Sequence, residues 1–278
     1  DIAMYHSKYN NLDFSFYTCE MEKLVVRKVL IAEKLSTAIE NGNLRLDYQP
    51  IVELKSNKLA GVEALMRWDD PDLSPISPSE FVPIAECQNI IVDISDWLLK
   101  ETAHQYHRWV AEGFKFSGRI AINLSERELT KPNRATEILT LLEGLEVSPE
   151  IYEIELSESA FISNVGDTQA NLDALAHAGM IITIDDFGTG HSALWQLRTQ
   201  KLDKLKIDHS FIQKMETDPA THDIVEAITA MANLLDLKVI AEGVESLKQV
   251  DLLKDIKCRY AQGYHFAKPL TAKAFASD

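Results

Sequence analysis

The sequence has few cysteines and no long apolar run. Its 278 residues include three cysteines, an odd number with no Cys-x-x-Cys pair: Cys19, Cys87 and Cys258. This usage favours free thiols in a reducing compartment over a disulfide framework. No apolar run approaches the roughly 18 residues of a membrane span, and Asp1–Asn11 lack the basic-then-apolar order of a signal peptide. We therefore expect a soluble cytoplasmic domain without membrane contact of its own.

Positive charge is also scarce. Lysine and arginine total 28 against 43 acidic residues, which gives a formal net charge of -15. Such a balance argues against a broad electrostatic grip on DNA, RNA or an anionic membrane. An anionic ligand would need local help, such as a bound cation. With 46% hydrophobic residues the chain can bury a sizeable core, and its length predicts one large domain or one domain plus a fragment.

Strand-like runs alternate with helix-like stretches along most of the chain, a pattern typical of parallel α/β architecture. Eight strand candidates suggest a closed (β/α)8 barrel, although periodicity alone leaves an open doubly wound sheet as the alternative. The strands are expected at 45–51, 59–65, 119–124, 151–156, 180–185, 204–207, 238–242 and 261–264. Amphipathic helices are expected at 93–111, 167–178, 220–235 and 247–256, as an outer ring.

Polar residues recur where these strand candidates end. They are Glu63, Asn123, Glu155, Glu158, Asp185, Asp186, Lys206, Asp208 and Glu242. In a parallel barrel the strand ends lie on one rim, where such folds place their chemistry. A single strand-end acid is usually a helix cap or a solvated charge, but five strands that end this way predict a converging cluster.

Crowded carboxylates repel, so the cluster predicts either raised pKa values or bound metal. The candidate ligands are carboxylates and one amide oxygen, with neither histidine nor cysteine among them. This set favours Mg²⁺ or Mn²⁺ over zinc. The adjacent acids Asp185 and Asp186 would let one carboxylate bridge two ions. Two ions about 4 Å apart suit in-line displacement at phosphorus, and hence phosphodiester hydrolysis.

At these residues the sequence resembles the EAL-domain phosphodiesterases, from Leu44 to Leu270. The matching segments, in order, are Tyr48-Gln-Pro-Ile51, Glu63-Ala-Leu-Met-Arg-Trp68, Ser77-Pro-Ser-Glu-Phe-Val-Pro-Ile-Ala-Glu86, Asn123-Leu-Ser125, Glu155-Leu-Ser-Glu158, Asp185-Asp-Phe-Gly-Thr-Gly190, Lys206-Ile-Asp208, Ala241-Glu-Gly-Val-Glu245 and Gln262-Gly-Tyr264. The tripeptide Glu-Ala-Leu alone is uninformative, whereas the ordered set is highly specific.

The resemblance implies a modified TIM (β/α)8 barrel with one antiparallel strand, and hydrolysis of cyclic di-GMP to linear pGpG by a homodimer that uses two Mg²⁺ or Mn²⁺ ions. It implies these metal ligands: Glu63, Asn123, Glu155, Asp185 and Asp186. Lys206 would orient the attacking water and stabilise negative charge. Glu242 matches a residue that acts either as general base or as a metal-linked acid.

The remaining roles also follow from the resemblance. Glu158 would brace the loop after Asp186, in which Gly188 and Gly190 permit unusual backbone conformations. Substrate contacts would come from Gln49, Leu65, Arg67, Glu245 and Gln262, and the Arg67 guanidinium suits a phosphate. Leu65 and Gln262 would serve equally well in packing and capping.

The N-terminal segment differs from the rest. Asp1–Lys8 resembles the closing helix of a GGDEF domain, and 21–41 reads as one helix that ends at Asn41-Gly42. We therefore expect residues 1–20 to be the remnant of a GGDEF-like domain, 21–41 a connecting helix and 42–278 the EAL domain; an ordinary N-terminal extension is the alternative. The full-length protein could be tethered to a membrane through other regions. His191, Ala193 and Lys201 depart from the family pattern.

Two other functions compete with hydrolysis. A non-catalytic cyclic di-GMP receptor would generally lack some metal ligands, which are intact here. A barrel lyase with Lys206 as Schiff-base amine would leave the acids unexplained. Glu101, His104 and His107 share helical spacing, but one turn of an outer helix supplies too few converging metal ligands.

Overall fold

The computed structural model describes residues 19–73, 75–114, 116, 118–162, 166–189 and 201–276, and of residues 19–22 the backbone alone. These residues form two compact units. One contains the described residues up to Arg45 together with Met66–Ile94, and the other contains Leu46–Leu65 and the described residues from Ser95 onward. The segment that resembles a GGDEF terminus, residues 1–8, lies outside the described part of the chain, as do Gly190, His191 and Ala193.

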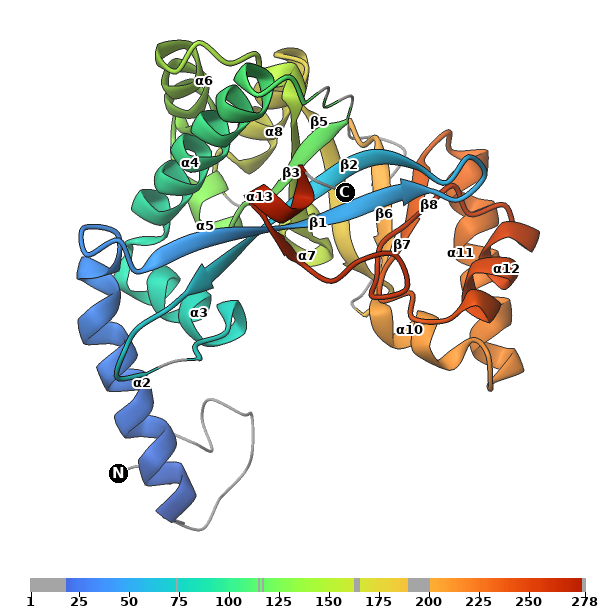
Figure 1. Cartoon of the computed structure of the whole chain (residues 1–278), viewed down its shortest axis with the longest axis horizontal. Coiled ribbons are helices and arrows are strands. Elements are labelled where there is room, and N and C mark those ends of the chain that lie inside the picture. Colours follow the sequence, from blue (N-terminus) through green and yellow to red (C-terminus); the bar gives the residue numbers. More distant parts are fainter. Residues whose placement is uncertain are drawn as a thin grey trace. The chain divides into compact units, whose positions relative to one another are not determined.

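The second unit is built on a closed barrel of eight strands, as the sequence predicts (Figure 1). The strands are β1 (Leu44–Glu53), β2 (Lys58–Trp68), β3 (Arg119–Asn123), β4 (Tyr152–Ser157), β5 (Ile181–Phe187), β6 (Lys204–Ile207), β7 (Lys238–Ala241) and β8 (Tyr260–Ala261). Neighbouring strands from β2 to β8 pair in parallel, and β1 closes the ring between β8 and β2.

The antiparallel strand expected in the barrel is β1, which runs antiparallel to β8. A ninth strand that the sequence did not predict, β9 (Leu270–Thr271), pairs with β1 through Asp47 and Tyr48. The last barrel strand, β8, is only two residues long. It begins one residue before the predicted run and ends at Ala261, because the chain then turns at Gly263.

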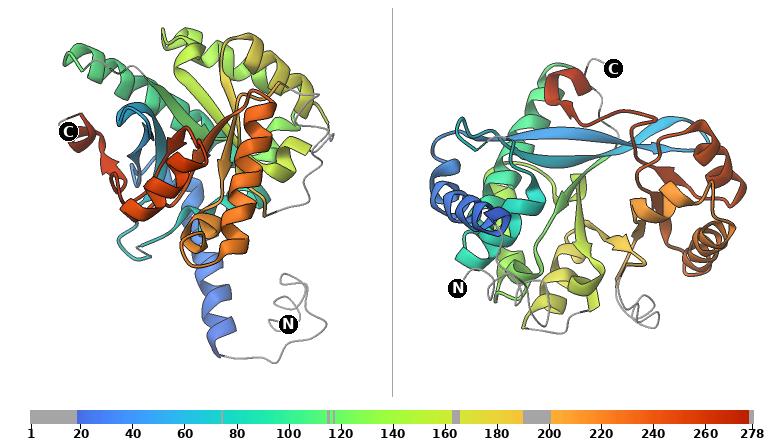
Figure 2. Two further views of the ribbon diagram at one scale, coloured as in Figure 1. Left: turned by 90° about the vertical axis from the view of Figure 1, so that its right-hand side faces the viewer. Right: turned by 90° about the horizontal axis from the view of Figure 1, so that it is seen from below.

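Helices lie outside the ring of strands (Figures 1 and 2). The longer ones are α6 (Arg134–Gly144), α8 (Thr168–His177), α11 (Pro219–Leu234) and α12 (Leu247–Asp255), and α4 (Ile91–Ala111) runs through both units. The shorter ones are α5 (Glu126–Leu129), α7 (Glu158–Ile162), α10 (His209–Lys214), α13 (Ala272–Phe275) and the 3-10 helix η1 (Pro149–Ile151). Local sequence explains their starts. Ser246 and Gln249, for example, cap α12 by reciprocal hydrogen bonds of 3.1 and 3.0 Å between side chain and backbone.

The interior of the barrel is partly apolar and partly polar. Ile51, Ala121 and Ile240 come from strands that are not neighbours and pack together, so they meet inside the ring. Because side chains alternate along a strand, Glu153 and Glu155 of β4 both point inward. Glu153 bonds to Lys204 and to Thr183, whereas Glu155 belongs to a second polar layer two residues further along.

The first unit contains α2 (Cys19–Ala38) and α3 (Pro78–Gln88). The helix expected at 21–41 ends three residues earlier, and the turn that follows brings Gly42 to φ +66°. Arg27 on α2 binds Glu80 on α3, with Nε 2.7 Å from Oε1. Among the described residues no helix combines the length and the apolar character that crossing a membrane requires.

Candidate active site

Lys206 lies at the centre of the second polar layer, the one that contains Glu155. The residue is fully buried at the end of β6. Its Nζ is 2.7 Å from Glu242, 3.0 Å from Glu155, 3.3 Å from Asp185 and 3.4 Å from Glu63. Four acids from four different strands or the residues directly after them therefore converge on one ammonium group, as the strand-end pattern predicts.

Amide side chains complete this layer. Asn123, the last residue of β3, donates from Nδ2 to Glu63 Oε1 at 3.1 Å and to Glu155 Oε2 at 3.3 Å. Gln262, which follows β8, donates from Nε2 to Glu63 Oε2 at 2.7 Å and to Gln49 Oε1 at 3.0 Å. The Glu63 carboxylate is thus held from both sides. It lies within β2 rather than at its end, because β2 continues to Trp68.

The paired acids of β5 lie on a β-bulge. The register between β5 and β6 shifts between Ile184 and Phe187, so β5 contains one extra residue there. Asp186 takes a left-handed backbone conformation with φ +53°, which is uncommon for a residue other than glycine. On a regular strand Asp185 and Asp186 would point to opposite faces. Here carboxylate oxygens of both, together with one of Glu242, lie within 4.8 Å of one another.

The cluster shifts the pKa values of its members in both directions. Burial raises the pKa of Glu242 to about 8, with help from Asp185 and Glu63 and against the charge of Lys206. Burial also raises the pKa of Asp186 to about 6, and the nearby carboxylates of Asp185 and Asp208 add to this. These two groups therefore titrate near neutral pH in the cation-free protein.

The deeper acids differ from each other. Burial and the charge of Glu63 raise the pKa of Glu155 well above its usual range. Burial acts in the same sense on Glu63, but Lys206 and the donors Gln262 and Asn123 outweigh it and lower the Glu63 pKa. Although burial disfavours the Lys206 ammonium, the surrounding carboxylates raise its pKa well above the usual value.

The donor set fits hard divalent cations. Five carboxylates face one ammonium group, so full ionisation leaves an excess of four negative charges, which two divalent ions would neutralise. Glu155 Oε1 is buried and meets no hydrogen-bond donor within the described part of the chain, and buried oxygens rarely lack a partner. Asn123 presents Nδ2 to the carboxylates, and a half-turn of its amide would present the oxygen to a cation.

Glu158 follows β4 and is buried. Its Oε2 accepts a hydrogen bond of 3.2 Å from the backbone N–H of Gly188. Gly188 has φ +99°, and a Cβ at this position would come within 2.9 Å of the Phe211 ring. Glu158 and Gly188 thus hold the chain just after the acidic pair.

A cavity of about 370 Å³ opens beside the acid cluster. Residues that the sequence analysis selects for catalysis or substrate contact line it: Gln49, Glu63, Leu65, Glu242, Glu245 and Gln262. The Oε1 of Gln262 is buried and has no hydrogen-bond partner among the described residues, so it offers an acceptor to a ligand. Arg67 lies in the first unit, where its Nη1 donates to the Met66 carbonyl at 2.9 Å. Its role toward substrate stays a prediction.

Three further residues line the cavity that the sequence did not predict as ligand contacts: His209, Gln213 and Tyr264. Tyr264 belongs to the Gln-Gly-Tyr segment, but nothing in that pattern marks it as a ligand contact. His209 follows the Lys-Ile-Asp segment directly. Its neighbour Asp208 is the signal that could have identified it, because an acid beside a histidine commonly orients the ring.

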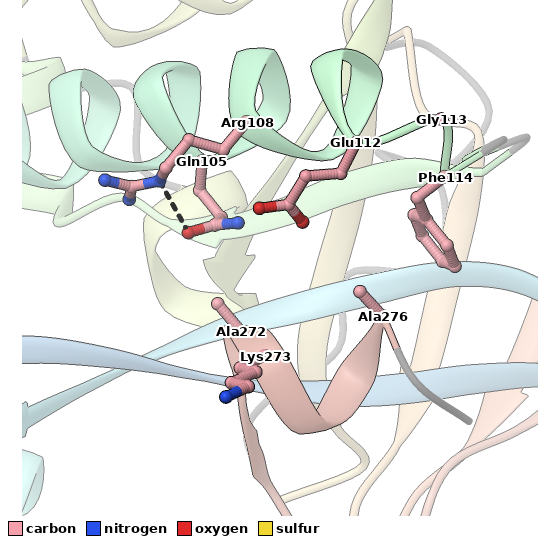
Figure 3. A pocket seen from close by; sticks show the side chains of 8 residues that line it. All are labelled: Gln105, Arg108, Glu112, Gly113, Phe114, Ala272, Lys273 and Ala276. Atoms are coloured by element: carbon pink, nitrogen blue, oxygen red, sulfur yellow. Dashed lines mark hydrogen bonds between the residues drawn. The ribbon is translucent and has the colours of Figure 1, made fainter.

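A larger cavity of about 680 Å³ lies between α4 and α13 (Figure 3). One of its polar groups, the Arg108 guanidinium, is engaged by neighbouring side chains. Arg108 donates to Gln105 at 3.0 Å, as Figure 3 shows, and to Glu101 at 2.6 Å. Glu101 is therefore engaged in an ion pair, and His107 Nε2 lies 2.9 Å from the Leu145 carbonyl oxygen. Both contacts argue against a metal site on this helix, as expected from its spacing.

The chain is similar in sequence to several known proteins. The chain is 37% identical to signaling protein YkoW of Bacillus subtilis over 99% of its length and 34% of the relative. It is 33% identical to the bifunctional diguanylate cyclase/cyclic di-GMP phosphodiesterase MucR of Pseudomonas aeruginosa, over 98% of this chain and 40% of the relative. It is also 33% identical to the cyclic di-GMP phosphodiesterase PdeR of Escherichia coli, over 99% of this chain and 41% of the relative. The chain thus spans well under half the length of these curated relatives.

A solved structure shows the same fold. The PaMucR phosphodiesterase in complex with c-di-GMP superposes with a TM-score of 0.83 at 34% identity, over 88% of this chain and 99% of that one. The EAL domain model matches residues 32–269, which include the barrel and every residue of the acid cluster. The chain therefore belongs to the EAL domain family.

Proposed function

We propose that the chain hydrolyses cyclic di-GMP to linear pGpG with two divalent cations, Mg²⁺ or Mn²⁺. Five side chains would hold the ions: Glu63, Asn123, Glu155, Asp185 and Asp186. The observation that carries this proposal is the convergence of the acids on Lys206, with more negative charge than one ammonium can neutralise. The names of MucR and PdeR, and the c-di-GMP complex of PaMucR, support the choice of substrate.

The chemistry divides between the ions and the chain. When bound, the cations would polarise the phosphodiester and make a water molecule more acidic. Lys206, which its surroundings keep protonated, would orient the attacking water and stabilise negative charge on the phosphate oxygens. Glu242 lies 2.7 Å from Lys206 and has a pKa near 8 before cations bind. Its carboxylate form, which bound cations would favour, would be placed to accept the proton that the attacking water loses.

Substrate would lie in the adjoining cavity. Gln49, Leu65, Glu245 and Gln262 line it, and we assign contacts with cyclic di-GMP to these four residues and to Arg67. Glu158 would act at a distance from the phosphate, because its contact is with the Gly188 backbone. It is a positioning residue for the acidic pair of β5.

The state of Lys206 counts against a Schiff-base lyase. An amine that attacks a carbonyl must lose its proton, and catalytic lysines of this kind have lowered pKa values. The four carboxylates around Lys206 raise its pKa instead. A metal-dependent hydrolase accounts for both the lysine and the acids.

We extend the proposal to the protein from which this chain comes. The chain would be the EAL part of a cytoplasmic GGDEF-EAL protein that acts as a homodimer, with 1–20 as the GGDEF remnant, 21–41 as the connecting helix and 42–278 as the EAL domain. The bifunctional name of MucR supports this arrangement. Sedimentation of the chain at micromolar concentration tests the dimer, and a monomer would contradict it.

The direct test is to incubate the chain with cyclic di-GMP and Mg²⁺ or Mn²⁺ and to follow pGpG by chromatography. We expect metal-dependent pGpG that disappears with EDTA and in Glu63→Ala. Binding without product would favour a receptor, and neither binding nor product would refute the proposed substrate.

A further inference from the structure

Part of the cavity wall comes from α10. His209 and Gln213 both line it, and residues four apart lie on the same face of a helix. Neither belongs to the acid cluster, and the hydrolysis proposed above uses neither. The two side chains therefore present polar groups to a ligand in this cavity.

His209 is held in a defined orientation. Its Nδ1 lies 2.9 Å from Oδ2 of Asp208, and the other oxygen of Asp208 accepts the N–H of Ser210 at 3.1 Å. Because the buried Asp208 carboxylate accepts a hydrogen bond from Nδ1, the neutral ring has its free acceptor at Nε2. The side chain is 60% exposed, so this nitrogen is open to a ligand.

Gly243 explains how the imidazole fits beside the catalytic acids. A Cβ at Gly243 would lie 2.7 Å from the Cβ of His209, closer than carbon atoms approach. Gly243 also has φ +67°, which disfavours other residues. The base of the histidine side chain therefore packs directly on the backbone that follows Glu242.

The acceptor groups that line the cavity favour a ligand that donates hydrogen bonds. Besides Nε2 of His209, the cavity offers the Glu245 carboxylate and the unpartnered Oε1 of Gln262. A guanine base donates from N1–H and from its 2-amino group, whereas the same edge of adenine has its 6-amino group as donor and an acceptor at N1. Tyr264, which is 57% exposed, adds an aromatic surface on which a base can stack.

We propose that His209, oriented by Asp208 and packed on Gly243, is a specificity-determining residue whose Nε2 accepts a hydrogen bond from a guanine of the substrate. This inference rests on the proposed function. It assigns base recognition to α10, while the acid cluster acts on the phosphodiester.

The test compares His209→Ala with His209→Gln, which keeps an acceptor, and with His222→Ala on α11 as control. KM and kcat are measured with cyclic di-GMP, and cyclic di-AMP is measured as a competitive inhibitor. We expect His209→Ala to raise KM about tenfold, as one lost hydrogen bond predicts, with kcat changed less than about twofold. The ratio between the cyclic di-AMP inhibition constant and KM should fall about tenfold as well, while His209→Gln and His222→Ala stay within about threefold of wild type.

The outcomes separate the two proposals. Equal weakening of both nucleotides in His209→Ala, a change confined to kcat, or no change would overturn the guanine contact while hydrolysis stands. If wild type binds cyclic di-GMP without cleaving it, the hydrolysis fails and Kd replaces KM in the same comparison. If wild type does not bind cyclic di-GMP, both proposals are wrong.

Discussion

Lys206 and Glu242 form the shortest of the four Lys206 ion pairs, with Nζ 2.7 Å from Oε1. The pair joins the end of β6 to the residue that follows β7. In the cation-free protein this buried ammonium is the positive charge on which the acids converge. Its removal should therefore affect stability as well as activity, and bound cations should compensate for part of the stability.

Lys206→Met should destabilise the EDTA-treated protein by about 3–5 kcal/mol, since it leaves buried carboxylates without their cation. Chemical denaturation measures this loss. Addition of Mg²⁺ should recover more unfolding free energy in the variant than in wild type, because the ions neutralise the same acids. Lys204→Met is the matched control. Lys204 lies two residues before Lys206 on β6, and its replacement breaks the buried ion pair with Glu153. This variant should show no such recovery of unfolding free energy on addition of Mg²⁺. An equal response of both variants to Mg²⁺ would contradict the assignment.

The raised pKa values predict that acid stabilises the cation-free fold. A carboxyl group whose pKa is higher in the folded than in the unfolded state binds its proton more tightly when folded, so stability falls as pH rises toward the folded pKa. Asp186 and Glu242, at about 6 and about 8, should make the unfolding temperature in EDTA decline from pH 5 to 8. Glu63 and Lys206 stay ionised throughout this window because their pKa values move away from it.

Calorimetric scans in EDTA at several pH values measure this decline. Glu242→Gln should make the decline shallower above pH 6, where Asp186 has already titrated and the raised pKa of Glu155 still contributes. A stability that rises between pH 6 and 8 in wild type would show that Glu242 is ionised in the folded protein.

Cation binding should depend on Asp186. Its carboxylate lies on the β5 bulge beside Asp185 and Glu242, so Asp186→Asn should weaken Mn²⁺ binding at least tenfold or reduce its stoichiometry, as measured by titration calorimetry. A second group, His222, Asp223 and Glu226, also brings three ligand atoms together, but on an exposed turn of α11. Asp223→Asn should leave Mn²⁺ binding unchanged, and a loss there would relocate the site.

The Glu158 contact predicts an effect transmitted through the backbone. Glu158→Ala removes the acceptor of the Gly188 N–H and should lower kcat at least tenfold and weaken Mn²⁺ binding, since Asp186 is two residues from Gly188. Glu158→Gln keeps an acceptor oxygen and should retain most activity. If both variants lose activity equally while Mn²⁺ binding is intact, Glu158 acts by its charge and not by positioning.

Much of this site was predictable because the alternation of side chains along strands determines which residues face the barrel interior. Alternation in β4 places Glu153 and Glu155 on one face, and parallel strands bring their ends to one rim. The sequence could not show that Glu153 pairs with Lys204 while Glu155 faces Lys206. That distinction depends on register between strands that are separated by about fifty residues along the chain.

Other features lay beyond pattern reasoning. The bulge that turns Asp185 and Asp186 to one side requires a left-handed aspartate, which local propensity disfavours. The hydrogen bond from Gln262 to Gln49 joins residues 213 positions apart, and no local signal encodes such a contact. His209 lines the cavity because the chain returns there after β7, where Gly243 packs against it, and the sequence alone does not encode that contact.

Glu155 and Glu153 allow a direct test of a metal centre at the second polar layer of the barrel. They lie two residues apart on the same face of β4, and both are buried. We would measure pGpG formation from cyclic di-GMP with Mg²⁺ for Glu155→Gln and Glu153→Gln, normalised to folded protein. We expect Glu155→Gln to lose activity by more than about a hundredfold and Glu153→Gln to keep it within about threefold. Equal activities, or the reverse order, would contradict a metal centre at this layer.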